Sequence, residues 1–245
     1  MARQHFSYDI IHYIGGEDDT NHNISRRMLL LLESDRISLD TSSEISGTAH
    51  DRVIRGIFQQ YIDNDSGFAA PTRKENVPRF LLNDIVRFWR TMCVDFAYKQ
   101  REQQGKKWAL RNIELRMSRR LIFVKGLLMC FKIYNTALSR DKIKQELRKF
   151  VSQKPLQFMV SVFEENDVPD NYIVDLLDAY DKYLGMLNDE QFRDHLKNLL
   201  MHKAYEDPKF EEARANSHKF QNTLNKIFIG EKNKVSEFTL KYGVF

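Results

Sequence analysis

The sequence predicts a mainly α-helical protein, a multi-helix bundle with at most a short strand near the N-terminus. The first observation is a low content of chain breakers, 10 Gly and 5 Pro among 245 residues, which favours long helices over many turn-linked strands. The second is that apolar residues recur at helical spacing along most of the chain. The third is that capping residues and prolines stand at the ends of these segments. We expect the helices to form two lobes.

The composition is that of a soluble globular chain. A hydrophobic content of 42% is enough for a core, and 29% charged residues indicate a solvated surface. The formal net charge of +4 is too small to imply nucleic-acid binding by itself. Cys93 and Cys130 both lie in apolar stretches, where we expect buried thiols in a reducing compartment. No Cys and His spacing typical of a metal site occurs, so no resident metal is predicted.

The sequence predicts a cytoplasmic protein without a membrane partner. The longest apolar run, Leu121–Phe131, is interrupted by Lys125 and is too short to cross a bilayer. The N-terminus also lacks the charged-then-apolar organisation of a signal peptide.

The N-terminal part is predicted to contain one extended segment and two helices. Residues 6–16 are rich in Ile and aromatic residues and predict one strand or a short extended arm that ends at a Gly-Gly pair. A helix is expected over residues 24–34, and an irregular loop over residues 40–48 follows, with Thr48 as an N-cap. The next helix, residues 49–64, places six apolar side chains on one face: Val53, Ile54, Ile57, Phe58, Tyr61 and Ile62.

From Pro78 onward nearly the whole chain is predicted to be helical, after an irregular connection over residues 65–78. The first of these helices has a broad apolar face formed by Phe80, Leu81, Ile85, Phe88, Trp89, Met92, Cys93 and Phe96. Residues 106–138 can form one helix of about 50 Å, whose more apolar C-terminal half we expect to be more deeply buried. Ser139 is the predicted N-cap of the next helix. The boundaries of three more helices are marked by Pro155, Pro169 and Asn188. Two polar helices, near residues 207–229 and 235–242, are expected at the surface.

In the stretch "RFLLNDIVRFWRTMCVDF", polar and charged residues lie among the apolar positions of the predicted helix. Asn83, Arg87 and Arg90 share one face because they are four and three residues apart. Asp84, Thr91 and Asp95 form a neighbouring stripe. Asp84 can pair with Arg87 one turn on, and Thr91 with Asp95 is another turn-spaced pair. Such a stripe offers forked donors and carboxylates beside an aromatic wall, which suits a phosphate or a base. The alternative interpretation is an ordinary solvated face with intrahelical ion pairs.

A basic segment, residues 99–120, follows this stripe. It contains eight basic and two acidic side chains, a net charge of +6. Its predicted nucleic-acid contacts are Lys99, Arg101, Lys106, Lys107 and Arg111, and Trp108 is placed to stack on a base. The alternative is a solvated helix surface, because several of its arginines spread around the helix circumference.

The stretches "HYIGGEDDTNHNISRRMLLLLES", "AHDRVIRGIFQQYI", "RFLLNDIVRFWRTMCVDF" and "GKKWALRNIELRMSRRLIFVKGLL" are similar to bacterial predicted nucleotidyltransferases. These polymerase-beta-like enzymes are related to the uridylyltransferases that modify the nitrogen-signalling protein PII. The similarity covers residues 12–128. It implies that residues 1–138 resemble the helical region that follows the catalytic domain, with a C-terminal helical lobe over residues 139–245.

The catalytic signature of that family is a Gly-Ser turn followed by an Asp-x-Asp pair, which hold the triphosphate and Mg²⁺. This sequence has no Gly-Ser pair, and its acidic stretch "GGEDDT" (residues 15–20) lacks the serine and the strand spacing. Met1 falls after the point where the catalytic hairpin would end. We therefore expect a nucleotide- or acceptor-binding region that is not catalytic alone. Two alternatives stay open: its partner is a catalytic nucleotidyltransferase subunit or domain, or the chain is a remnant of such an enzyme.

These observations define two hypotheses for the binding function. In the first, Arg87 and Arg90 contact nucleotide phosphates, Asn83 or Asp95 orients the ligand, and Mg²⁺ accompanies the nucleotide. In the second, the chain is a non-catalytic helical module that binds RNA or protein through the basic segment.

Overall fold

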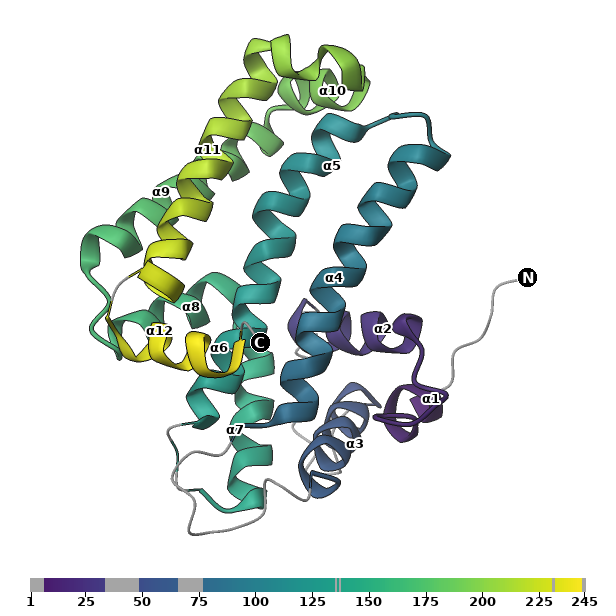
Figure 1. The fold of residues 1–245 in the computed structure, drawn as a ribbon, viewed down its shortest axis with the longest axis vertical. Helices are drawn as coiled ribbons and strands as arrows, with labels where there is room; N and C mark the ends of the chain where they lie inside the picture. The colour runs from purple at the N-terminus through teal and green to yellow at the C-terminus, as the bar shows by residue number, and fades with distance from the viewer. Residues whose placement is uncertain are drawn as a thin grey trace, which may run out of the picture. The chain divides into compact units, whose positions relative to one another are not determined.

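The computed structural model describes residues 7–33, 49–65, 77–134, 136, 138–230 and 232–243. Within these residues every regular element is a helix and no strand occurs (Figure 1), which confirms the predicted mainly α-helical fold. The expected loop over residues 40–48, with Thr48, and most of the irregular connection over residues 65–78 lie outside the described residues. No helix in the described part of the chain is both long and apolar enough to cross a bilayer.

The helices up to residue 134 are α1 (Ser7–His12), α2 (Asn21–Leu32), α3 (Ala49–Asp63), α4 (Arg79–Glu102), α5 (Trp108–Glu114), the π-helix η2 (Leu115–Arg119) and α6 (Arg120–Tyr134). The later ones are α7 (Arg140–Ser152), α8 (Pro155–Glu164), α9 (Asp170–Asn188), α10 (Glu190–Asn198), the 3-10 helix η3 (Met201–Glu206), α11 (Pro208–Asn225), the π-helix η4 (Lys226–Gly230), α12 (Lys234–Phe238) and the π-helix η5 (Thr239–Gly243).

The prediction of a strand or extended arm over residues 6–16 is wrong, because α1 occupies its centre. Tyr8 and His12, one helical turn apart, stack with their ring centroids 4.5 Å apart. Ile11 packs against α3, where a Cβ on Gly56 would lie 3.0 Å from the Ile11 Cδ1 atom. A turn-spaced ring contact and a tertiary contact therefore favour the helix over the extended form.

The helix predicted over residues 106–138 is confirmed in outline. α5, η2 and α6 follow one another without interruption from Trp108 to Tyr134, with the π-helical turn in the middle. In this turn the Ser118 hydroxyl donates to the Glu114 carbonyl at 3.0 Å. The C-terminal half is the more deeply buried, as expected, since most side chains of α6 are buried.

The predicted N-cap at Ser139 and the predicted helix boundaries at Pro155, Pro169 and Asn188 are confirmed. The Ser139 hydroxyl accepts from the Lys142 backbone N–H at 3.5 Å, and Pro155 is the first residue of α8. Pro169 precedes α9, and Asn188 is the last residue of that helix. On α4 the predicted apolar face is only partly buried, because Phe80 is exposed and the side chains after Phe88 are half-buried.

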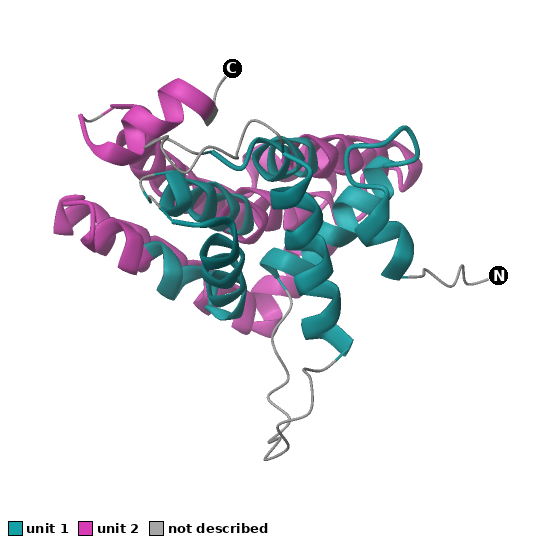
Figure 2. Cartoon of the chain, turned by 90° about the horizontal axis from the view of Figure 1, so that it is seen from below, with its two compact units in different colours: residues 1–88, 122–159 teal, residues 89–121, 160–245 magenta. Residues whose placement is uncertain are grey.

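The chain divides into two compact units, which Figure 2 shows in different colours. Unit 1 comprises residues 1–88 and 122–159, and its core includes Met28, Ile57, Phe58, Ile85, Phe88 and Leu128. Unit 2 comprises residues 89–121 and 160–245, and its core includes Met117, Phe163, Leu176, Tyr183, Phe210 and Phe220. These units are defined by contacts. They differ from the two regions that the family resemblance implies, residues 1–138 and 139–245, and that functional division stays a prediction.

The two cysteines differ in environment. Cys130 is buried in unit 1, as expected, and burial raises the pKa of its thiol. Cys93, in unit 2, is half-buried, and burial raises its pKa while the charge of Arg120 opposes that shift. Each thiol is therefore less readily ionised than an exposed cysteine.

Tyr183 in the core of unit 2 should make stability depend on alkaline pH. Burial raises the pKa of its phenol to about 12, against about 10 in an unfolded chain. The folded state holds this proton more tightly, so the stabilisation is complete below pH about 10 and is lost as the pH rises through the folded pKa. We expect this group alone to lower the free energy of unfolding by about 2 kcal/mol by pH about 12.

Denaturant unfolding between pH 9 and 11.5 measures this slope, and Tyr183→Phe should reduce it. Tyr205→Phe is the matched control, because the Tyr205 side chain is exposed. The same slope in wild type and Tyr183→Phe would contradict the assignment.

Candidate functional site

Among the described residues of unit 1, Arg27 is the most completely buried charged side chain. It lies on the face of α2 that also buries Ile24, Met28 and Leu31, so helical periodicity alone points it into the core. An unpaired guanidinium there would cost several kcal/mol, and it persists only with hydrogen-bonding partners.

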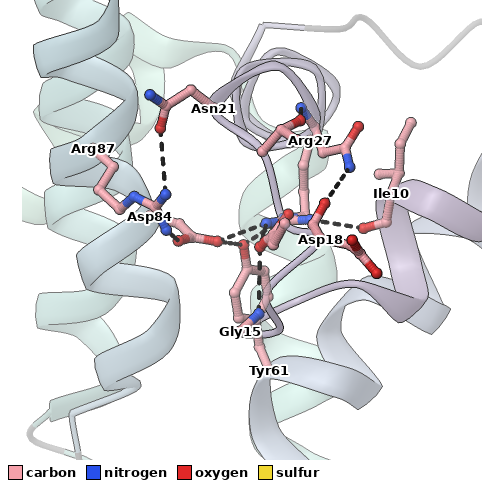
Figure 3. Close-up of polar contacts among 11 residues, drawn as sticks. Ile10, Gly15, Asp18, Asn21, Arg27, Tyr61, Asp84 and Arg87 are labelled. Carbon is pink, nitrogen blue, oxygen red and sulfur yellow. Dashed lines mark hydrogen bonds and ion pairs between the residues drawn. The ribbon is translucent and has the colours of Figure 1, made fainter.

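Those partners come from separate parts of unit 1, as Figure 3 shows. The Arg27 Nη2 atom lies 2.7 Å from Asp19 Oδ2 and 2.8 Å from Asp84 Oδ2. Its Nε donates to the Tyr61 hydroxyl at 2.7 Å, and its Nη1 donates to the Ile10 carbonyl at 2.9 Å. The Tyr61 hydroxyl donates in turn to Asp84 Oδ2 at 2.5 Å. We call Ile10, Asp19, Arg27, Tyr61 and Asp84 the Arg27 network.

The network keeps Arg27 charged and Tyr61 neutral. Burial by itself lowers the pKa of Arg27, but Tyr61, Asp19 and Asp84 together raise it above its ordinary value. Burial, followed by the negative charge of Asp84, raises the pKa of Tyr61 well above its ordinary value. At neutral pH the arginine is therefore a donor to two carboxylates, and the tyrosine hydroxyl carries its proton.

This arrangement fixes the segment between α1 and α2 as well as the three helices α2, α3 and α4. Asp19 Oδ2 also accepts from the Gly15 backbone N–H at 3.3 Å, in a turn where Gly15 has φ +76°. Thr20 then caps α2 by accepting from the Asn23 N–H at 3.3 Å. The network thereby determines where the first turns of α4 lie within unit 1.

Arg87 lies where the Arg27 network meets the surface. Its Nη1 atom is 3.8 Å from Asp84 Oδ1, and its Nη2 donates to Asn21 Oδ1 at 3.3 Å (Figure 3). Its side chain keeps 40% of its exposure. Arg27 and Tyr61 hold the Asp84 carboxylate in place through hydrogen bonds. This buried carboxylate in turn orients the partly exposed guanidinium of Arg87.

The other residues of the predicted stripe have different environments. The predicted pairing of Asp84 with Arg87 is confirmed, but Asp84 does not belong to an exposed stripe, because only 4% of it is exposed. Asn83 and Arg90 are exposed on α4. Asp95 forms an exposed ion pair with Lys99 at 2.6 Å. Asn83 and Arg87 belong to unit 1, and Arg90 and Asp95 belong to unit 2.

The basic segment lies in unit 2 and is mostly solvated. Arg101, Lys106 and Lys107 are exposed in or beside the connection from α4 to α5, and Arg111 is half-buried. The idea that Trp108 stacks on a base is wrong, because only 6% of Trp108 is exposed. Its indole N–H donates to Gln100 Oε1 at 3.3 Å, and its ring packs against Phe210. Trp108 is a core residue of unit 2.

The acidic stretch over residues 15–20 is divided by the fold. Asp19 is buried in the ion pair with Arg27, whereas Glu17 and Asp18 are exposed. In the described part of the chain no group of three or more His, Cys, Asp and Glu side chains is arranged to hold a metal ion. The ion pair makes Asp19 a structural partner of Arg27 in this fold.

Sequence reasoning missed the Arg27 network, although a signal for it was present. Arg27 and Asp84 each occupy a position that the spacing of their apolar neighbours assigns to a buried helix face. A charged residue at such a position indicates a buried partner of opposite charge. The pattern does not say which partner, because Arg27 and Asp84 are 57 positions apart.

Comparison of this chain with protein-family models, with curated proteins and with solved structures found no match.

Proposed function

We propose that this chain is the helical, ligand-binding region of a nucleotidyltransferase-like protein, and that the polar face of α4 contacts the nucleotide or the acceptor. The observation that carries the proposal is the state of Arg87, which is oriented by Asp84 and Asn21 while 40% of its side chain stays exposed. A guanidinium whose conformations are restricted by two neighbouring groups loses less conformational entropy when it binds a phosphate.

The roles of the neighbouring residues follow from their chemistry. Arg90 is exposed and is the second phosphate contact, while Asn83 or Asp95 orients the ligand through hydrogen bonds. Mg²⁺ enters with the nucleotide rather than through a site of this chain. The similarity over residues 12–128 supports a bacterial, cytoplasmic protein whose chemical step belongs to a catalytic subunit or domain.

Removal of the two arginines should weaken nucleotide binding at least tenfold, since a hydrogen bond to a charged group contributes about 1.5–3 kcal/mol. The measurement is equilibrium titration of wild type and Arg87→Ala/Arg90→Ala with each Mg²⁺-nucleoside triphosphate. The matched control is Arg55→Ala/Arg79→Ala, which removes the same charge from exposed positions on α3 and α4. Unchanged affinity in the first variant, or equal losses in both, would end the proposal.

A second candidate function is binding of RNA through the basic segment, and the exposure of Arg101, Lys106 and Lys107 favours it. Backbone binding releases counterions, so affinity for single-stranded RNA should fall steeply with salt and depend little on sequence. The triple change Arg101→Ala/Lys106→Ala/Lys107→Ala should lower the slope of log affinity against log salt by about 2. A slope that does not change would exclude this segment as the RNA contact.

A further inference from the structure

Four basic side chains of unit 2 gather where α11 packs against η2. Arg116 and Arg120 lie four residues apart along η2 and the start of α6, and Arg214 and His218 lie one turn apart on α11. Figure 1 shows α11 running beside α5, the helix that leads into η2. Burial and the charges of Arg116, Arg214 and Arg120 lower the pKa of His218, while Glu211 opposes them. We call Arg116, Arg120, Arg214 and His218 the Arg116 cluster.

Two buried donors of the Arg116 cluster have no acceptor among the described residues. Arg120 Nη1 and Arg214 Nε are buried and form no hydrogen bond within the described residues. The Arg116 Nε donates to the neutral Asn112 Oδ1 at 2.8 Å, and the Arg120 Cζ lies 5.7 Å from the Trp89 ring centroid. Buried donors of this kind cost free energy unless a partner arrives.

Carboxylates do not balance the charge of the Arg116 cluster. Arg214 pairs with Glu211 at 3.0 Å, but Arg116 and Arg120 form no ion pair with a carboxylate in the described part of the chain. Burial and the nearby Arg116 lower the pKa of Arg120, so these two like charges destabilise each other. An anion placed among them would remove this repulsion and accept from the unused N–H groups.

We propose that the Arg116 cluster binds a phosphoryl group of a small ligand. Guanidinium forks match the tetrahedral oxygens of phosphate, and Arg120 and Arg214 each have a buried N–H to donate. All four side chains are half-buried, so they suit one compact anion better than a polymer backbone. The exposed lysines of the basic segment are better placed to contact a polymer backbone. The site is independent of Arg87, which belongs to unit 1.

Calorimetric titration with pyrophosphate tests the proposal, using wild type and Arg116→Gln/Arg120→Gln. We expect wild type to bind and the variant to lose at least tenfold in affinity, while Arg119→Gln/Lys203→Gln, with the same change in net charge, loses less than threefold. Arg87→Ala should bind pyrophosphate like wild type, which separates this site from the proposed nucleotide contact. Titration with a nucleoside triphosphate and with inorganic phosphate shows whether the phosphoryl group comes from a nucleotide or from free phosphate.

A second measurement uses the wild-type protein alone, so it does not require that a variant folds correctly. Bound phosphate should raise the pKa of His218, measured from its imidazole NMR signals, because the anion offsets the charges of Arg116, Arg120 and Arg214. An unchanged His218 pKa at saturating pyrophosphate, no binding by wild type, or equal losses in the variant and its charge-matched control would each overturn the proposal.

Discussion

Arg27→Ala should lower the free energy of unfolding by about 3–5 kcal/mol. The change removes the guanidinium that pairs with the buried Asp19 and Asp84 and that donates to Tyr61 and Ile10. Natural domains are stable by only about 5–15 kcal/mol, so the variant would lie close to its unfolding threshold. Urea unfolding followed by circular dichroism measures the difference.

Arg26→Ala is the matched control for this substitution. Arg26 is the adjacent residue on α2, it is half-buried, and it forms no ion pair in the described residues. We expect its effect to stay below about 1 kcal/mol. A double-mutant cycle between Arg27→Ala and Asp84→Ala should be non-additive, because the two side chains pair directly and share Tyr61 as a partner. Additive effects, or equal losses at positions 26 and 27, would show that the network does not stabilise the fold.

Lys125→Met should lower the free energy of unfolding by about 2–4 kcal/mol. Lys125 lies within the apolar helix α6, yet only 2% of it is exposed. Its Nζ donates to the Val151 carbonyl at 3.1 Å and to the Gln153 carbonyl at 2.7 Å, at the C-terminal end of α7. A cation there satisfies carbonyls that have no helical partner and complements the helix dipole.

Methionine keeps the length and apolar stem of lysine, so the variant isolates the loss of the ammonium group. Lys142→Met on the exposed side of α7 is the control and should change the unfolding free energy by less than about 0.5 kcal/mol. The assignment fails if Lys125→Met is as stable as wild type or more stable.

Helix positions followed from local patterns, because apolar spacing, caps and breakers act within a few residues. The cap at Ser139 and the helix starting at Pro155 are examples. The error over residues 6–16 arose because Ile and aromatic residues suit a strand, while the contact of Ile11 with α3 that favours a helix is tertiary.

The candidate site was predicted only in part, for the same reason. The pairing of Asp84 with Arg87 is one turn long and could be predicted, whereas the pairing of Asp84 with Arg27 and Tyr61 depends on how three helices pack. Trp108 shows the reverse case: its basic neighbours suggested a base-stacking role, but the burial of its ring by Phe96, Tyr205 and Phe210 places it in the core.

The most direct test of the proposed nucleotide contact is photo-crosslinking of wild type in the presence of Mg²⁺. The probe is a nucleoside triphosphate with an azido group attached to its triphosphate, and mass-spectrometric peptide mapping then identifies the labelled peptide. Our account predicts that the label falls on the α4 peptide that contains Asn83, Arg87 and Arg90, and that unlabelled nucleotide and Arg87→Ala both reduce it. Labelling confined to other peptides, or labelling that unlabelled nucleotide does not compete away, would contradict it.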